Sequence, residues 1–535
     1  MCPLRFSQKV ERIGLALSTV HEPLVDPVRI DIMRTAQTRY MTILLCIAAL
    51  HIHLAAQEEP RDTAATYEEA LLSAIHSISS HTLYDYVKEL SSAKYQGRLT
   101  GTPGYDDAAQ WAADFFQKWK IKPAGDGGSY FQKFPNPYTL VLGSGEVILH
   151  IPAGKKDTVK KSYRFEEDFF PGSTSDAGSV TSEVVYVGYG ITAPELNYDD
   201  YKGVDVKGKI VMMEPEIPIS PNREPEVFMR WRPYSFHDYK MKNAFAHGAA
   251  GVVYNYHIVN PNCVFIKGLV LMYVGRNVIN DVFRGTGRIR DTLVQKIQRD
   301  RRPFSFNTGK IVSVTCVTEH HPEGTGKNVL GLLEGTDPAL RNEVIILGAH
   351  LDHVGKNHLP MPGANDNASG VAVLMGAAEA IAKTSGFLKR SVLFILFGAE
   401  EQGVKGSEFY LAHPVVPNTR VKAFMNLESV GRGAKLRVGA AKNYPHLWEI
   451  VERNNRSYIH RSITADTTAN LGRPRQDAAH FLWANIPTIG IGSYGAPPPP
   501  VATYHTTQDK LEYITPEILE DIARLTFLTA MDLSR

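Results

Sequence analysis

The chain of 535 residues has little net charge, few cysteines and no long uninterrupted apolar segment. Its 58 Lys and Arg residues nearly balance 56 Asp and Glu residues, so the formal net charge is only +2. A charge this small gives no support for nucleic-acid binding. The sequence also lacks a basic stripe interleaved with aromatics and a glycine-rich phosphate loop followed by Lys-Ser or Lys-Thr. We therefore expect no nucleic-acid partner.

The chain has four cysteines, none with the spacing of a metal site. Cys2 and Cys46 would be removed with an N-terminal leader, which leaves Cys263 and Cys316. An exported chain could join these two as a disulfide. Two free buried thiols are an equally open alternative.

An apolar run near the N-terminus, MTILLCIAALHIHLAA at residues 41–56, follows two arginines and ends in two alanines. These features predict a secretory signal that is cut near Gln57, with a buried core helix as the alternative. Two histidines interrupt the run, and it is too short for a membrane span. We therefore expect an exported protein, periplasmic or secreted, with no stable membrane span after cleavage. Residues 1–56 are then an upstream extension and signal peptide, with the true start at Met33 or Met41.

The length predicts two domains after the leader, because one core seldom grows to this size. Residues 65–155 combine helical spacing with a Gly-Pro turn and some strands, and they are interpreted as the N-terminal part of a catalytic domain. Residues 160–320 change to short β-rich runs between Gly, Pro and Asp turns. We interpret them as an inserted domain, and residues 326–535 as the rest of the catalytic domain.

The last of these segments alternates near-continuous apolar runs with helical patterns. The runs are EVIILGAH, SVLFILFGAEE, KAFMNLESV and IPTIGIGS, and the helices between them include GVAVLMGAAEAIAKTSG. Apolar runs of this kind are typical of strands buried on both faces. The pattern predicts an α/β fold with a mixed, largely parallel central sheet flanked by helices, together with the inserted β-rich domain.

Histidines and acidic residues follow these runs, where open α/β sheets place their sites. Carboxylates and imidazoles are preferred zinc ligands, and an adjacent Glu pair offers one carboxylate beyond ligation that could act as a base. The pattern indicates a co-catalytic zinc hydrolase, most simply a peptidase. The candidates are His350 and Asp352 in HLD, Asp366 in GANDNASG, the pair Glu400-Glu401, Glu428 in NLESVGR, and His505 in YHTTQD.

Each candidate has an ordinary alternative when it is taken alone. His350 could be a surface histidine near an acid, and Asp366 could cap a helix. Asp509 is close enough in sequence to orient His505, although His505 could also be a plain loop residue. The Glu pair could be a solvated acidic turn, although adjacent carboxylates at a strand end repel each other without a cation. Their joint order and strand-end placement make the combination specific.

These motifs resemble the di-zinc exopeptidase superfamily, which holds secreted aminopeptidases, glutamate carboxypeptidase and glutaminyl cyclases. The resemblance covers roughly residues 65–150 and 326–535, including the leading segment QGRLTGTPGYDDAAQW. The middle region resembles a protease-associated domain. The resemblance implies exported hydrolysis of N-terminal residues from peptide substrates with two Zn²⁺ ions. It says nothing about the oligomeric state.

The resemblance also implies residue roles. His350 and Glu428 would bind one zinc, Glu401 and His505 the other, and Asp366 would bridge the two. Glu400 would be the general base and Asp352 would orient His350, while Asp477 falls where the family often has Ser-Asp-His. Position 428 is Glu where relatives usually carry Asp, so the first zinc is expected to sit differently or bind weakly.

Three other functions stay open. A glutaminyl cyclase-type acyltransferase or a carboxypeptidase could use the same motifs, since these do not define which chain end is bound. A non-catalytic binding ectodomain is possible on this fold, although every ligand position and Glu400 are kept.

Overall fold

The structure, a computed structural model, describes residues 63–153, 157–467, 476–499 and 502–535. The expected signal peptide, with Cys2 and Cys46, lies outside these residues. Residues 70–535 form one compact unit. Over the described ranges, no helix combines the length and apolar character needed to cross a membrane.

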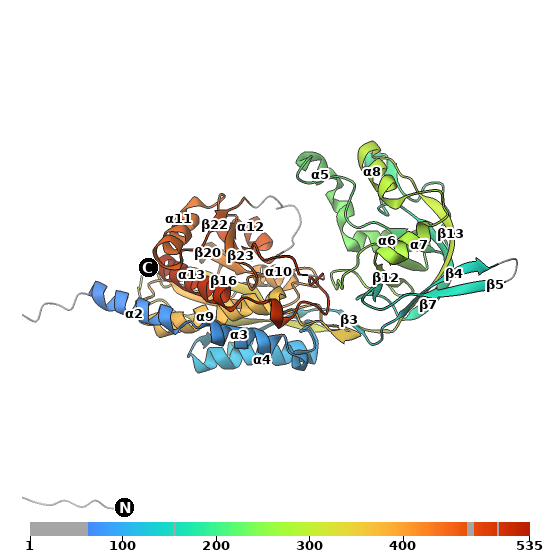
Figure 1. Cartoon of the computed structure of the whole chain (residues 1–535). Helices are drawn as coiled ribbons and strands as arrows, with labels where there is room; N and C mark the ends of the chain where they lie inside the picture. The colour runs from blue at the N-terminus through green and yellow to red at the C-terminus, as the bar shows by residue number, and fades with distance from the viewer. Residues whose placement is uncertain (1–62, 154–156, 468–475, 500–501) are drawn as a thin grey trace, which may run out of the picture. The chain divides into compact units, whose positions relative to one another are not determined.

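A nine-stranded mixed sheet forms the centre of the fold (Figure 1). Its four central strands, β19, β16, β20 and β23, are mutually parallel, and antiparallel pairs flank them. This confirms the predicted α/β class and its mixed sheet. The order is β1 (Lys122–Pro123), β15 (Thr325–Leu333), β19 (Ser391–Phe397), β16 (Val344–His350), β20 (Val421–Leu427), β23 (Thr488–Tyr494), β21 (Lys435–Gly439) and β22 (Ile463–Ala465), with β2 (Phe131–Pro135) paired to β15.

Helices cover both faces of this sheet because its central strands are apolar on both faces. On one face, Leu393 and Ile395 of β19 pack with Phe481 of α12. On the other face, Phe394 meets Phe116 of α4, as side chains that alternate along a strand must. Helices α9 and α13 also pack against β16. The helices are α2 (Thr63–Ser77), α3 (Ser80–Leu90), α4 (Pro103–Lys118), α9 (Ser369–Lys383), α10 (Lys405–Ala412), α11 (Pro445–Asn454), α12 (Ala478–Trp483) and α13 (Pro516–Ser534).

A second, eight-stranded sheet is built from residues 146–316. It begins with the strand at 146–153, which the sequence placed before the expected start of the insert at 160. Cys263 and Cys316 are both free thiols in this region. The strand order is β5 (Asp157–Ser162), β4 (Glu146–Ala153), β13 (Phe306–Cys316), β7 (Gly178–Tyr186), β10 (Ile210–Met213), β11 (Gly251–Tyr254), β12 (Val270–Val274) and β6 (Phe169–Pro171); a ribbon of β8 (Thr192–Ala193) and β9 (Tyr198–Asp199) and helices α5 (Pro225–Trp231), α6 (His237–Ala246), α7 (Arg276–Phe283) and α8 (Arg290–Asp300) accompany it.

The chain enters and leaves this second sheet through neighbouring strands, β3 (Tyr138–Val141) and β14 (Thr318–His321), which pair antiparallel. The short strands β17 (Lys356–Asn357) and β18 (Leu359–Pro360) extend this linking sheet. Val354 and Met361, from the loop after β16, belong to the same apolar cluster as Met241 of α6. The loop that follows His350 therefore packs on the core of the second sheet.

Arg98, in the N-terminal segment, fixes the same loop. Its side chain is fully buried, and it donates hydrogen bonds to the backbone oxygens of Leu351, at 3.0 Å, and Gly363, at 2.9 Å. It donates further bonds to Leu90 and to Pro362. A buried guanidinium is tolerated only when its donors are satisfied in this way. Arg98 thus joins the end of α3 to both ends of the loop at residues 351–363.

Replacing Arg98 with Met keeps most of the side-chain volume but leaves several buried carbonyls without a donor. We expect the free energy of unfolding to fall by about 3 kcal/mol or more. Urea denaturation followed by circular dichroism measures this change. Arg276→Met, which alters an exposed arginine, should leave the midpoint nearly unchanged. Equal midpoints for Arg98→Met and the wild-type chain would contradict the argument.

Candidate metal centre

The turn after β16 carries His350 and Asp352. The strand is buried along its whole length, so His350 stands at its carboxyl end inside the protein. His350 Nδ1 lies 3.1 Å from the backbone oxygen of Asp352 and 3.8 Å from its Oδ1. The Asp352 carboxylate also accepts hydrogen bonds of 3.2 Å from the N–H groups of Glu400 and Glu401. Asp352 therefore holds both the histidine and the glutamate turn.

Asp366 lies in the loop before α9, and Asp509 holds its backbone. The Asp509 carboxylate accepts hydrogen bonds from the N–H of Asp366, at 2.9 Å, and from that of Asn365. The sequence suggested that Asp509 might orient His505, but Asp509 instead fixes the Asp366 loop. The next residue, Asn367, donates to the Leu427 oxygen at 3.0 Å. The loop is thereby tied to the end of β20.

His505 is oriented from the second sheet. Its Nδ1 lies 2.8 Å from the backbone oxygen of Val259, and the Val259 N–H donates to the His505 oxygen at 3.1 Å. This pairing directs Nε2 toward Glu401 Oε2, at 3.0 Å, and Asp366 Oδ2, at 3.2 Å. A histidine whose Nδ1 is held by a carbonyl presents a defined Nε2 to a metal. A residue of the inserted region thus sets the orientation of His505.

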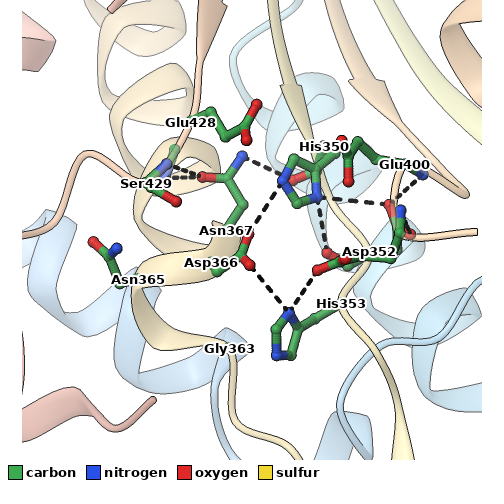
Figure 2. A network of polar contacts seen from close by, with 12 residues as sticks. His350, Asp352, His353, Gly363, Asn365, Asp366, Asn367, Glu400, Glu428 and Ser429 are labelled. Atoms are coloured by element: carbon green, nitrogen blue, oxygen red, sulfur yellow. Dashed lines mark hydrogen bonds and ion pairs between the residues drawn. The ribbon is translucent and has the colours of Figure 1, made fainter. Parts of the chain in front are cut away.

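The two oxygens of Asp366 face different histidines. Oδ1 lies 3.4 Å from His350 Nε2, whereas Oδ2 lies 3.2 Å from His505 Nε2. Figure 2 shows His350 between Asp366 and Asp352, with Glu400 beyond. A carboxylate with one oxygen toward each of two ligand groups has the arrangement that a bridging ligand needs.

The donor set fits a metal ion. One ligand atom from each of His353, Asp366, Glu401 and His505 lies within 4.8 Å of the others, and all four residues are buried. The Nε2 atoms of His350, His353 and His505 are buried and make no hydrogen bond in the described structure. Ligand atoms on a tetrahedral zinc stand about 3.3 Å apart. The spacing, burial and unsatisfied nitrogens all suit a cation.

The charges of the cluster depend on one another. Burial alone would lower the pKa of His505, but Glu401 and Asp366 raise it to about 10. Burial would raise the pKa of Glu401, but the His505 charge lowers it to about 2. Burial raises the pKa of Glu400 well above its usual range, against the opposing charge of His350, and Glu428 and Glu401 add to the rise. A bound cation would let these carboxylates ionise together.

Glu428 and Asp477 both interact electrostatically with His350. Burial raises the pKa of Glu428 to about 8 and that of Asp477 to about 7, and His350 opposes both shifts. Glu428 Oε2 accepts a long hydrogen bond of 3.4 Å from Asn426. Glu428 is therefore electrostatically coupled to His350, although it is not one of the four residues grouped above.

His353 is the site residue that the sequence reasoning missed. Its Nδ1 lies 3.0 Å from Glu401 Oε1, and its side chain is fully buried. The only local signal is the spacing His350-x-x-His353 in HLDH. The apolar run before this motif predicted that His350 ends a strand. Nothing in the sequence showed that His353 would turn toward Glu401.

A cavity of about 120 Å³ opens onto Glu400, Glu401 and His505. Its walls come from both sheets. The described residues that line it include two histidines and three glutamates but no lysine or arginine. The remaining wall residues are Glu216, His237, Tyr256, Asn260 and Asn262 from the inserted region, together with Val404 and Tyr504.

Comparison with known proteins places this geometry in a family. Residues 328–530, which carry every predicted site residue, match Peptidase family M28. An aminopeptidase of Pseudomonas aeruginosa (strain UCBPP-PA14) is 27% identical over 352 residues, or 64% of this chain and 56% of that protein. The chain thus spans little more than half the length of this curated relative.

Solved structures share the fold. The aminopeptidase from Aneurinibacillus sp. strain AM-1 aligns with a TM-score of 0.59 at 23% identity, over 86% of this chain and 95% of that one. A zinc aminopeptidase from Bacillus subtilis aligns with a TM-score of 0.57 at 20% identity, over 86% and 96%. Residues 328–530 of this chain therefore match peptidase family M28, and the chain shares its fold with these two aminopeptidase structures.

Proposed function

We propose that this chain is a zinc-dependent aminopeptidase that removes N-terminal residues from peptides. The observation that carries the proposal is the buried group of histidines and carboxylates opening onto a cavity whose described charged wall residues are all histidine or glutamate. The family match and the aminopeptidase relatives support it.

In this proposal, Asp366 would contribute its carboxylate to both of two zinc sites. His350 and Glu428 would complete one site, and Glu401 and His505 the other. Such ions supply Lewis acidity for the scissile carbonyl and lower the pKa of a bound water toward neutrality. The two Asp366 oxygens lie near different histidines, Oδ1 near His350 and Oδ2 near His505, which supports the bridging role.

Glu400 would move the proton. Its carboxyl lines the same cavity as Glu401 and His505, and burial raises its pKa well above the usual range. A neighbouring cation would keep this carboxylate ionised, so that it could accept a proton from the attacking water and then donate it to the leaving amine nitrogen. Asp352 would keep Glu400 in place through the backbone N–H bond and would fix His350, so it is a positioning residue.

The cavity favours the amino end of a peptide. A carboxypeptidase recognises a terminal carboxylate, which requires a cationic partner such as arginine or lysine. The described wall of the cavity instead presents Glu216, Glu400 and Glu401. These carboxylates would attract an α-ammonium group and repel a terminal carboxylate.

Two further assignments belong to the proposal. The region near residues 160–320 would be a protease-associated-like domain that borders the substrate entrance; its contribution of Asn260 and Asn262 to the cavity wall supports this role. The apolar run at 41–56 supports export to the periplasm or the medium.

Glu400→Gln tests the general base. The amide cannot accept the proton, so we expect kcat for release of N-terminal residues to fall by about 10²–10⁴-fold. Zinc content should be unchanged, because Glu400 is not assigned as a ligand. Glu408→Gln, on the exposed side of α10, is the matched control. Near wild-type activity in Glu400→Gln would reject this base, and cyclisation of N-terminal Gln without amino-acid release would indicate a cyclase.

Glu428→Gln tests the first zinc site. Loss of this carboxylate should weaken one site and spare the other, so that zinc measured by plasma emission falls from about two ions per chain to about one. Glu428→Asp should keep both. If Glu428→Gln retains full zinc after dialysis against a weak chelator, Glu428 is not a ligand.

His353→Ala tests the support of Glu401. Loss of a group that holds a ligand typically weakens metal affinity by about 10–100-fold. We expect a change of this size at the second zinc site, measured by competition with a chelating dye. His353→Asn, which can still donate to Glu401, should recover part of the affinity. Unchanged affinity in His353→Ala would show that the 3.0 Å contact has no part in zinc binding.

A further inference from the structure

A second cavity, of about 280 Å³, lies beside the metal centre. Its walls come from the inserted region, the linking strands and the turn after β19. The residues that matter most are Asp238, Asn262, Gln402 and Lys405. Apart from Asn262, which also lines the metal cavity, none of them has a part in the proposed function above.

The two cavities share part of their lining. Along the turn after β19, Glu401 and Val404 line the metal cavity, whereas their sequence neighbours Gln402 and Lys405 line the second one. Asn262 lines both. The shared Asn262 and the adjacent residues of one turn place the two cavities side by side, so the second is a candidate for the part of a peptide that extends beyond the metal centre.

The contact between the inserted region and this turn is close. Gly403 has a φ of +108°, and a Cβ at this position would lie 3.2 Å from Asn262 Oδ1. A side chain at position 403 would therefore be strained and would crowd Asn262. Glycine lets the inserted region approach the turn that carries Glu401 and Lys405.

Lys405 places a half-buried ammonium in this second cavity. Its Nζ donates one long hydrogen bond of 3.4 Å to Asn136 Oδ1. Among the described residues, no carboxylate lies within ion-pairing distance of it. Asn136 is itself fixed, because its Nδ2 donates to the Thr100 oxygen and to Gln402 Oε1. A lysine held this way, partly desolvated and without an anion, is suited to bind one.

Asp238 lines the same cavity from the inserted region. It is an electrostatic neighbour of Lys405, but the two are not an ion pair in the structure. Burial lowers the pKa of Lys405, and the charges of Asp238 and Glu408 oppose this shift. The cavity thus offers one cationic and one anionic group, and the second could accept peptide N–H bonds.

We propose that this second cavity is a subsite for the part of the substrate that follows the scissile bond, in which Lys405 binds a carboxylate of the peptide. The proposal rests on the aminopeptidase function. It predicts a preference for short peptides whose terminal carboxylate, or an acidic side chain just after the scissile bond, reaches Lys405. It also gives the inserted region a share in selecting substrates.

The test uses equilibrium binding, so that it does not depend on turnover. In Glu400→Gln holoenzyme, calorimetry would compare Leu-Ala, Leu-Ala amide and Leu-Asp amide. We expect Leu-Ala to bind about tenfold tighter than its amide, the size of one charge-assisted hydrogen bond with partial solvent exposure. If Lys405 instead binds a side-chain carboxylate, Leu-Asp amide will bind about tenfold tighter than Leu-Ala amide.

Adding Lys405→Met should abolish the preference for the carboxylate ligand and leave the affinity for Leu-Ala amide unchanged. Adding Asp238→Asn is the matched control, because it removes the opposite charge from the same cavity and should keep or increase the preference. The proposal is overturned if Lys405→Met weakens the acid and the amide equally, or if no ligand distinguishes them. Carboxylate preference without peptide hydrolysis by the wild-type chain would reject the aminopeptidase function and keep the subsite.

Discussion

The burial of several carboxylates in one place is the constraint on which the rest of this structure depends. Asp352, Asp366, Glu400 and Glu401 are all buried, with Glu428 beside them. Like charges at such distances cannot all ionise in a protein interior without compensation. Three buried imidazoles lie beside these carboxylates, and their Nε2 atoms make no hydrogen bond in the described structure, so each could bind a cation in its neutral form. A cation centre follows from this arrangement more directly than from any single motif.

Side chains from distant parts of the chain hold these ligands in position. Arg98 fixes the backbone at both ends of the loop after β16. Asp509 fixes the backbone of Asp366, and Asp352 fixes the turn that carries the two glutamates. The Val259 carbonyl fixes His505 from the inserted region. A metal site needs this kind of outer support, because ligand orientation governs affinity. The inserted region is therefore part of the site's construction as well as a neighbour of it.

The sequence predicted the strands of the central sheet well, because apolar runs such as EVIILGAH and SVLFILFGAEE allow few alternatives. Strand β4, which the sequence analysis assigned to residues 65–155, pairs with β13 of the second sheet, and its ordinary alternating pattern could belong to either sheet. The sequence left the two remaining cysteines open, and both are free. The sheet to which β4 belongs and the state of the two cysteines depend on contacts between distant segments. A single sequence does not reveal these contacts.

The sequence by itself determined which residues could be ligands and that they follow strand ends, because residue type and hydrophobic pattern are local properties. It also determined that Glu400 and Glu401 would be a costly pair without a cation. Only the tertiary structure decided that His353 turns toward Glu401, that Asp509 holds Asp366 rather than His505, and that Lys405 enters a separate cavity. These outcomes depend on which distant backbone atoms lie within a few ångströms, and chain folding alone brings those atoms together.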